Sequence, residues 1–164
     1  MKKQFLDLGK QPIANAFLYE NDFKSEYFFN LKVGFDEETK LVSLMEYVDP
    51  SKMFNDQYVY HSSLSNTMQN HFTEAAISFK KLFSPISVLE IGSNDGVFIK
   101  HFPKNTTIAV EPCGNFAKKT NDNGYHTYAE FWNLETAKKI VQEKNKQDLV
   151  FSANCICHIQ DLDD

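Results

Sequence analysis

The sequence has few cysteines and no long hydrophobic run. Its three cysteines, Cys113, Cys155 and Cys157, are odd in number and show no framework spacing, so a disulfide scaffold is not expected. No apolar stretch approaches the ~20 residues that cross a bilayer, and the N-terminus has no hydrophobic signal segment. These absences predict a cytoplasmic protein with reduced thiols and no membrane contact.

Positive charge is also scarce. The 164 residues include 17 Lys and Arg against 22 Asp and Glu, a formal net charge of −5, and no basic block. Because such a chain cannot neutralise many phosphates, nucleic acid is not an expected partner. Large apolar side chains are plentiful, with fifteen Phe and seven Tyr. They can build the core of one domain, or of one domain with a small appendage.

The hydrophobic pattern changes along the chain, and it divides the sequence into a small β-rich segment, residues 1–60, and a second domain, residues 61–164. In the first segment, residues 28–33 and 41–45 are strand-like and flank a polar stretch that can turn, which predicts a β-hairpin. From Leu64 onward, hydrophobic residues recur every three or four positions and predict an amphipathic helix. Ser84-Pro85 should end this helix.

Strands and helices then alternate. Strands are predicted at residues 86–91, 107–110, 125–128 and 148–153, and helices are expected near 97–101, near 113–121 and from residue 134. The last helix should be capped by Asn133 and bury Leu134, Ala137, Ile140 and Val141. This alternation is typical of an α/β fold, here a partial Rossmann-like sheet of about four parallel strands with helices on both faces.

A glycine-containing loop follows the first of these strands, with the sequence Glu90-Ile-Gly92-Ser-Asn94-Asp95-Gly96. In open α/β sheets, ligands bind at the carboxyl ends of strands. The two glycines allow the backbone to approach a ligand closely, and Asn tolerates a left-handed backbone. Taken alone, the loop also fits a tight strand-to-helix turn that binds nothing.

The second strand ends in Glu111-Pro112, and Glu111 lies 21 residues after Glu90. An acidic residue at this place can accept the ribose hydroxyls of an adenosine group. A dinucleotide fingerprint would have glycine where Asn94 stands, and Asp95 would repel a pyrophosphate. S-adenosylmethionine carries a sulfonium and an ammonium group but no phosphate, so charge favours it over NAD. A nucleotide-binding oxidoreductase is the disfavoured alternative.

Five segments together resemble, in order, the nucleotide-sugar C-methyltransferases, which include the 3-C-methyltransferases of deoxysugar biosynthesis. They are residues 6–17 (LDLGKQPIANAF), 58–63 (YVYHSS), 90–96 (EIGSNDG), 110–112 (VEP) and 154–162 (NCICHIQDL). The resemblance implies S-adenosylmethionine-dependent methylation of a carbon beside the keto group of a nucleotide-linked sugar. In such a reaction a base removes the acidic proton, and the enolate then attacks the methyl group.

The resemblance also implies roles for single residues. The expected cofactor-binding residues are Glu90, Gly92, Asn94, Asp95, Gly96, Glu111, Pro112, Phe131 and Asn154. Tyr60 and Ser62 would close the acceptor pocket. His158 is the local candidate for the base, although a histidine at a strand end is more often a structural or binding residue. Phe131 and Trp132 can lie beside the adenine or form a hydrophobic staple onto the following helix.

Two departures from the family are evident. Its N-terminal zinc module uses two C-x-x-C pairs, whereas here Asp36 and Thr39 stand at the second pair and no zinc is expected. Cys155 and Cys157 are expected to be inert rather than ligands.

The second departure concerns the sheet. Members of this class have seven strands, and four are predicted here before the sequence ends at Asp164. The alternative to an enzyme is therefore a noncatalytic S-adenosylmethionine-binding fragment. The free edge of the fourth strand is expected to pair with another segment or with a second copy.

Overall fold

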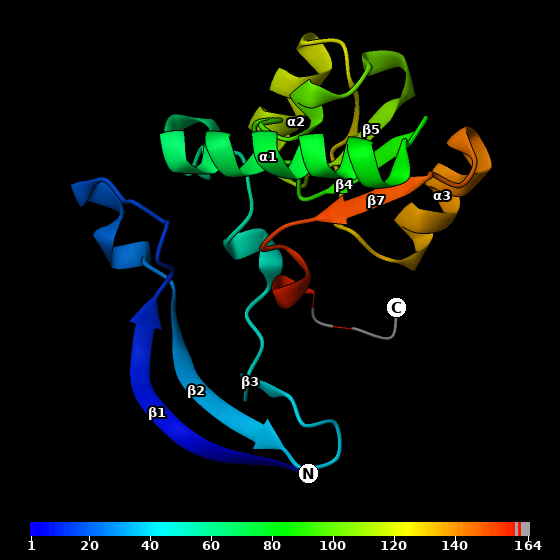
Figure 1. Ribbon diagram of the computed structural model, residues 1–164. Helices are drawn as coiled ribbons and strands as arrows, with labels where there is room; N and C mark the ends of the chain where they lie inside the picture. Colours follow the sequence, from blue (N-terminus) through cyan, green and yellow to red (C-terminus); the bar gives the residue numbers. More distant parts are fainter. Residues whose placement is uncertain (160, 162–164) are drawn as a thin grey trace. The chain divides into compact units, whose positions relative to one another are not determined.

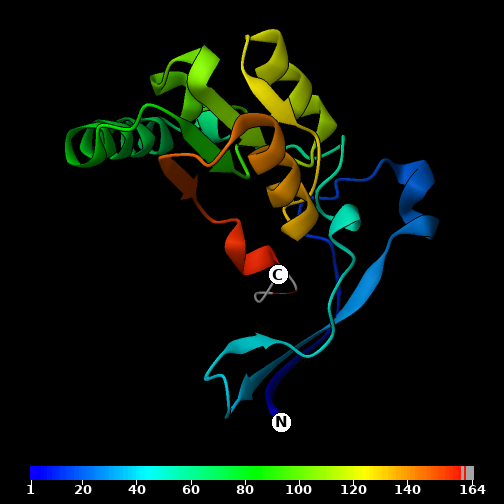
Figure 2. The same ribbon diagram turned by 90° about the vertical axis from the view of Figure 1, so that its right-hand side faces the viewer.

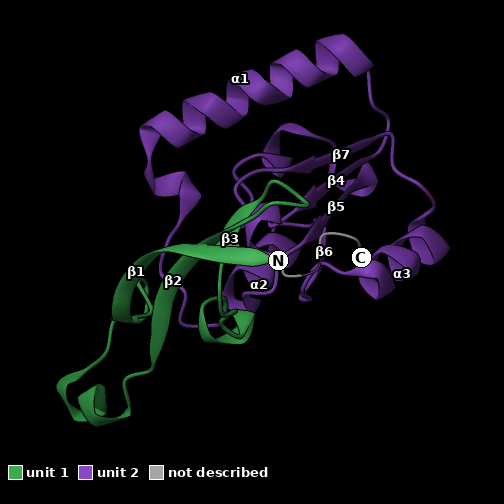
Figure 3. Ribbon diagram, turned by 90° about the horizontal axis from the view of Figure 1, so that it is seen from below, with its two compact units in different colours: residues 1–54 green, residues 55–164 purple. Residues whose placement is uncertain are grey.

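The computed structural model describes residues 1–159 and 161. The chain forms two compact units, Met1–Phe54 and Asn55–Asp164 (Figure 3). The sequence placed this boundary after residue 60. Residues 58–63 instead belong to the second unit, where the Ser62 amide donates to Asn94 Oδ1 and the Asn94 side-chain amide donates to the Tyr60 carbonyl, both at 2.9 Å.

The first unit contains an antiparallel sheet of β1 (Lys2–Pro12), β2 (Phe28–Asp36) and β3 (Val42–Leu44), in that order (Figure 1). The predicted hairpin of β2 and β3 is confirmed. Strand β1 was not predicted, because Gly9 and Pro12 are typical strand breakers. The structure accommodates them with a register shift between Asp7 and Lys10, where Gly9 has a φ of +69°, and with Pro12 as the last residue of the strand.

The second unit is built on a parallel sheet in the order β6-β5-β4-β7 (Figure 1). The strands are β4 (Val88–Ile91), β5 (Thr107–Val110), β6 (His126–Tyr128) and β7 (Leu149–Ser152). This confirms the predicted α/β, partial Rossmann-like fold. Strand β7 is an edge strand in the described part of the chain, and the expected pairing of its outer edge stays a prediction.

Helices cover both faces of this sheet. Figure 3 shows α1 (Asn66–Phe83) on one side of the strands and α3 (Leu134–Lys144) on the other. The predicted end of α1 is confirmed, because Ser84 adopts a left-handed conformation with a φ of +46°. Helix α2 (Gly114–Asp122) contacts β6, where the hydroxyls of Thr120 and Thr127 lie 2.8 Å apart.

The predicted cap of α3 is confirmed, but its predicted apolar face is only partly right. Asn133 Oδ1 accepts from the Thr136 amide at 2.9 Å. Ile140 is buried, whereas Leu134 and Val141 are each 45% exposed. Thr136 is buried in their place, because its hydroxyl donates to the Phe131 carbonyl at 3.0 Å and so keeps a partner away from water.

The helix predicted near residues 97–101 is a turn followed by a short 3-10 helix, η4 (Ile99–His101). Val97, Phe98 and Ile99 are all buried, so this segment lacks the polar face of an amphipathic helix. The Phe98 ring stacks on Phe151 of β7 with centroids 4.0 Å apart. These contacts fix the chain directly after the glycine-containing loop to the core on the α1 side of the sheet.

Over residues 1–159 and 161, the structure has no helix with the length and hydrophobicity needed to cross a bilayer.

Candidate cofactor site at the carboxyl edge of the sheet

The loop after β4 and the end of β5 lie against each other. The Gly92 amide donates to the Val110 carbonyl at 2.8 Å, and the Asn94 amide donates to Glu111 Oε2 at 2.7 Å. These bonds follow from the parallel pairing of the two strands, which end at the same edge of the sheet. The structure therefore brings together the two segments in which the sequence placed a cofactor.

Glu111 is buried, and its carboxylate is positioned by backbone amides. Besides the bond from Asn94, Oε1 accepts from the Cys113 amide at 2.8 Å. Burial raises the pKa of this carboxyl above its ordinary value, while the bonds from Cys113 and Asn94 oppose the shift. The Cys113 thiol also bonds to the carboxyl, so about one of the four acceptor positions of a carboxylate remains for a hydroxyl donor. The predicted contact with a ribose is compatible with this geometry and stays a prediction.

Glu90, the third residue of β4, is enclosed on the α1 side of the sheet. Its Oε2 has no hydrogen-bond partner among the described residues, although the Ile99 amide bonds to the carboxyl. Burial raises the pKa of Glu90 well above its ordinary value, and the neighbouring Glu111 and Asp95 raise it further. Because burial favours the neutral form of Glu90, it works against an attraction between this carboxyl and the ammonium group of S-adenosylmethionine.

Asp95 is engaged by its own chain. Its side chain is fully buried and accepts from the Ser63 amide and from Lys119 Nζ, each at 3.2 Å, and from the Ser63 hydroxyl. Burial raises the pKa of Asp95, but the bonds from Ser63 and Lys119 outweigh it and the pKa is lowered. The carboxylate is therefore charged and locally compensated, and its predicted contact with the cofactor stays untested.

We call residues 58–63 the strap, because side chains of the second unit hold this irregular segment along the loop. Asn94 bonds to it on both sides of His61, through the Ser62 amide and the Tyr60 carbonyl. Asn115 of α2 adds a bond from Nδ2 to the Tyr58 carbonyl at 3.3 Å. The predicted acceptor-pocket residues Tyr60 and Ser62 thus lie beside the predicted cofactor loop.

Sequence reasoning did not identify Ser63, Lys119 or the bridging role of Asn94. About thirty residues separate Ser63 from Asp95, and Lys119 lies further along the chain, in α2. No local spacing signals such contacts, because they depend on the tertiary fold.

The Cys155 side chain packs closely against Gly92. Gly92 has a φ of +73°, and a Cβ built on it would lie 2.9 Å from Cys155 Sγ. Cys155 therefore packs on the loop at a position that only glycine allows. The segment after β7 is in this way brought to the carboxyl edge of the sheet.

Two predicted residues lie in that segment. Asn154 is exposed and has a φ of +54°. His158 ends the short 3-10 helix η6 (Ile156–His158) and is also exposed. Their predicted roles stay predictions. The last part of the motif at residues 154–162 includes Gln160 and Leu162, which lie outside the described residues.

The remaining candidates follow β5 and β6. Pro112 is half-buried beside Glu111. Phe131 is 37% exposed, whereas Trp132 packs against the core cluster that includes Tyr128 and Ile140. Trp132 thus packs inward and Phe131 is partly exposed, and the predicted place of either beside an adenine stays a prediction.

The comparison with known protein families concerns the first unit. Residues 1–54 match the model of a methyltransferase-associated domain, Methyltransf_13, described as "Putative zinc binding domain". The matched residues coincide with that unit. The match supports a methyltransferase-related family. None of the curated proteins matches the chain.

Zinc does not fit the side chains of the matched segment. Residues 1–54 contain neither cysteine nor histidine, the usual ligands of structural zinc. Asp36 closes the turn after β2. Its Oδ1 accepts from the Glu38 amide at 2.9 Å and from the Thr39 amide at 3.2 Å. Within the described residues, no cluster of three or more His, Cys, Asp or Glu side chains is arranged for a metal ion.

Replacing Asn94 by glycine should loosen the strap. Asn94→Gly tolerates the φ of +49° but removes both side-chain bonds to the strap, which are worth roughly 0.5–1.5 kcal/mol each. We expect hydrogen exchange at the Ser62 amide to accelerate by about fivefold or more. Asn154→Gly is the matched control, because Asn154 also has positive φ. Unchanged exchange at Ser62 in the Asn94 variant would contradict the bridging role.

The buried Glu90 should make stability depend on pH. Because its folded pKa is raised, the folded state holds a proton that the unfolded state releases above about pH 4.5, so this residue's contribution to stability is lost as pH rises. Glu90→Gln keeps the shape and removes the titration. We expect the free energy of unfolding of the Glu90→Gln variant, measured with urea and compared with that of the parent chain, to increase between about pH 5 and about pH 8. Glu135→Gln, at an exposed position, serves as control. If the difference in free energy of unfolding between Glu90→Gln and the parent chain did not depend on pH, the raised pKa of Glu90 would be refuted.

Proposed function

We propose that the second unit binds S-adenosylmethionine at the carboxyl edge of its parallel sheet, and that the chain acts in methyl transfer to a carbon of a nucleotide-linked keto-sugar. The observation that carries the proposal is the 2.7 Å bond from the Asn94 amide to Glu111 Oε2. It joins a loop with left-handed Gly92, Asn94 and Gly96 to a buried acid at the end of the neighbouring strand. The match of residues 1–54 to a methyltransferase-associated domain supports the same type of function.

The electrostatics of the site favour a cofactor without phosphate. Three buried carboxyl groups, Glu90, Asp95 and Glu111, lie at this edge of the sheet. Lys119 Nζ is already paired with Asp95 at 3.2 Å. A pyrophosphate would meet carboxyl oxygens here rather than the bare amides and cations that usually bind it. NAD is therefore disfavoured.

Loop geometry points in the same direction. Asn94 takes the place of the glycine that lets a dinucleotide's pyrophosphate approach the backbone, and its side chain is held by the strap. Gly96 is buried against Thr120 and Ile99, so a smaller group can approach the backbone of this loop at half-buried Gly92. Such a loop suits the amino acid end of S-adenosylmethionine better than a diphosphate.

The residues present fit this cofactor at defined atoms. Glu111 keeps about one acceptor position for a ribose hydroxyl, and half-buried Gly92 exposes backbone beside Cys155. When bound, S-adenosylmethionine supplies an electrophilic methyl group on its sulfonium. Tyr60 and Ser62 of the strap would face the acceptor, and His158 would take the acceptor's proton.

A noncatalytic S-adenosylmethionine-binding fragment is the second candidate. Turnover of a keto-sugar nucleotide separates the two candidates, because both require binding of the cofactor and only one requires product.

Binding of S-adenosylhomocysteine tests the cofactor site directly. We expect calorimetry to show saturable binding and no binding of NADH. Glu111→Gln should weaken binding by about tenfold or more, because charge-assisted hydrogen bonds are worth about 1.5–3 kcal/mol each. Glutamine is chosen because alanine would leave both the Asn94 and the Cys113 amides without a partner.

Glu135→Gln, on the exposed surface of α3, is the matched control and should bind like the parent chain. Circular dichroism must show that both variants fold. A folded Glu111→Gln variant with unchanged affinity, or a parent chain that prefers NADH, would overturn the proposal.

A further inference from the structure

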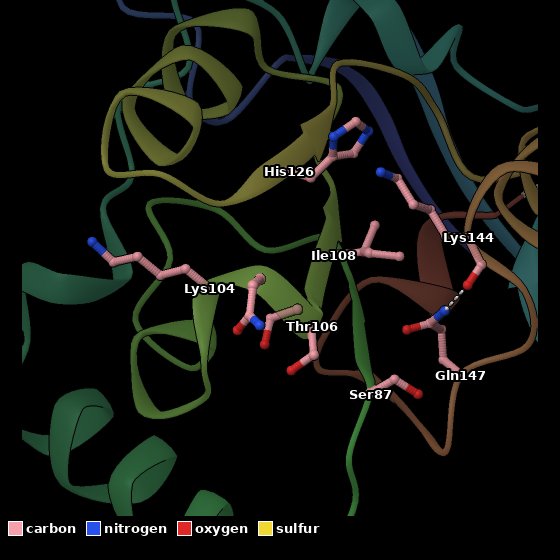
Figure 4. A pocket seen from close by; sticks show the side chains of 9 residues that line it. Ser87, Lys104, Thr106, Ile108, His126, Lys144 and Gln147 are labelled. Carbon is pink, nitrogen blue, oxygen red and sulfur yellow. Dashed lines mark hydrogen bonds between the residues drawn. The ribbon is translucent and has the colours of Figure 1, made fainter.

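A second candidate site lies at the opposite edge of the parallel sheet, where β5 and β6 begin. A cavity of about 180 Å³ opens there, well above the roughly 15 Å³ that one enclosed water needs on the same measure. Apart from Ile108, its lining is polar, and none of the lining side chains is acidic (Figure 4). The lining residues are Ser87, Lys104, Asn105, Thr106, Thr107, Ile108, His126, Lys144 and Gln147.

Lys144, at the end of α3, supplies the positive charge of this cavity. Figure 4 shows its ammonium group extending toward the His126 ring. Lys104 lines the opposite side with its aliphatic chain, and its ammonium lies 5.8 Å from the centroid of the Tyr125 ring. One cation is thus directed at the rim, in a chain whose formal net charge is −5.

A buried hydroxyl adds an independent observation. Thr106 Oγ1 is shielded from solvent and has no hydrogen-bond partner among the described residues. Leaving such a group unpaired in the folded protein costs free energy. Because Thr106 as a residue is half-buried, a rotation of its side chain would turn this hydroxyl toward the cavity and give it a ligand oxygen as partner.

The surroundings of His126 indicate a positive potential. Burial lowers the pKa of His126 below its ordinary value, and the charges of Lys144 and Lys139 lower it further. Glu143 acts in the opposite direction, but its carboxylate accepts from the Tyr128 hydroxyl at 2.6 Å. Lys139 is paired with Glu130, which leaves Lys144 as the cation facing the cavity.

We propose that this cavity binds a small phosphate-bearing anion, held by Lys144, the Thr106 hydroxyl and the polar groups around them. The site lies at the amino ends of the strands, whereas the candidate cofactor site lies at their carboxyl ends, so it does not depend on the proposed function. Lysine offers a point charge for phosphate, and the hydroxyl offers a directed donor. The absence of acidic side chains in the lining distinguishes this edge from the one at Glu111.

The test is a titration with inorganic phosphate and, separately, with glycerol 3-phosphate, each against sodium chloride of equal ionic strength. We expect saturable changes in the ring signals of His126 and the amide of Thr106 by NMR, together with a rise in the pKa of His126. Lys144→Gln and Thr106→Val should each weaken binding by about fivefold or more. Lys138→Gln, on the exposed surface of the same helix, should bind like the parent chain.

Binding of either phosphate compound supports the proposal, and the tighter of the two identifies the source of the phosphate group. Changes that chloride reproduces would overturn it, because they reflect screening alone. Equal affinities of the folded Lys144→Gln and Lys138→Gln variants would also overturn it.

Discussion

A hydrogen bond between two loops defines the candidate site of this protein. The Asn94 amide, after β4, donates to the carboxylate of Glu111, after β5, and the Cys113 amide donates to the other oxygen. These bonds compensate a carboxylate that the fold buries, and they fix the glycine-containing loop in position. The side chain of Asn94 extends the arrangement to the strap. One buried acid and one asparagine thus connect segments from three parts of the sequence.

The sequence predicted the sheet and the proximity of residues 90–96 to Glu111, because both follow from local patterns. Strand β5 was predicted with the bounds it has, since Thr107 and three apolar residues follow a polar turn. Parallel strands carry their loops to one edge, so two strand ends were enough to place the loop beside the acid.

Other features depend on tertiary contacts that no spacing reveals. The engagement of Asp95 by Ser63 and Lys119 joins distant segments. Strand β1 escaped prediction because Gly9 and Pro12 are tolerated there through a register shift and a strand end. Burial of Thr136 in place of Leu134 depends on a hydroxyl that finds a carbonyl partner.

The two units contribute different kinds of information. The match to a methyltransferase-associated domain lies in residues 1–54, whereas the candidate chemistry lies in the second unit. In the first unit, the carboxylate of Asp36 closes the turn between β2 and β3 by accepting from two backbone amides. The hairpin is therefore held by backbone hydrogen bonds and strand pairing without the donor set for zinc.

Amide NMR during a titration with S-adenosylhomocysteine tests the central claim most directly. The account predicts that the largest shifts occur at Gly92, Asn94 and Gly96, and at Cys113, whose amide reports on the Glu111 carboxylate. Ser87 and Thr106, at the other edge of the sheet, should be unaffected. Shifts confined to that other edge, or no shifts at any concentration, would contradict it.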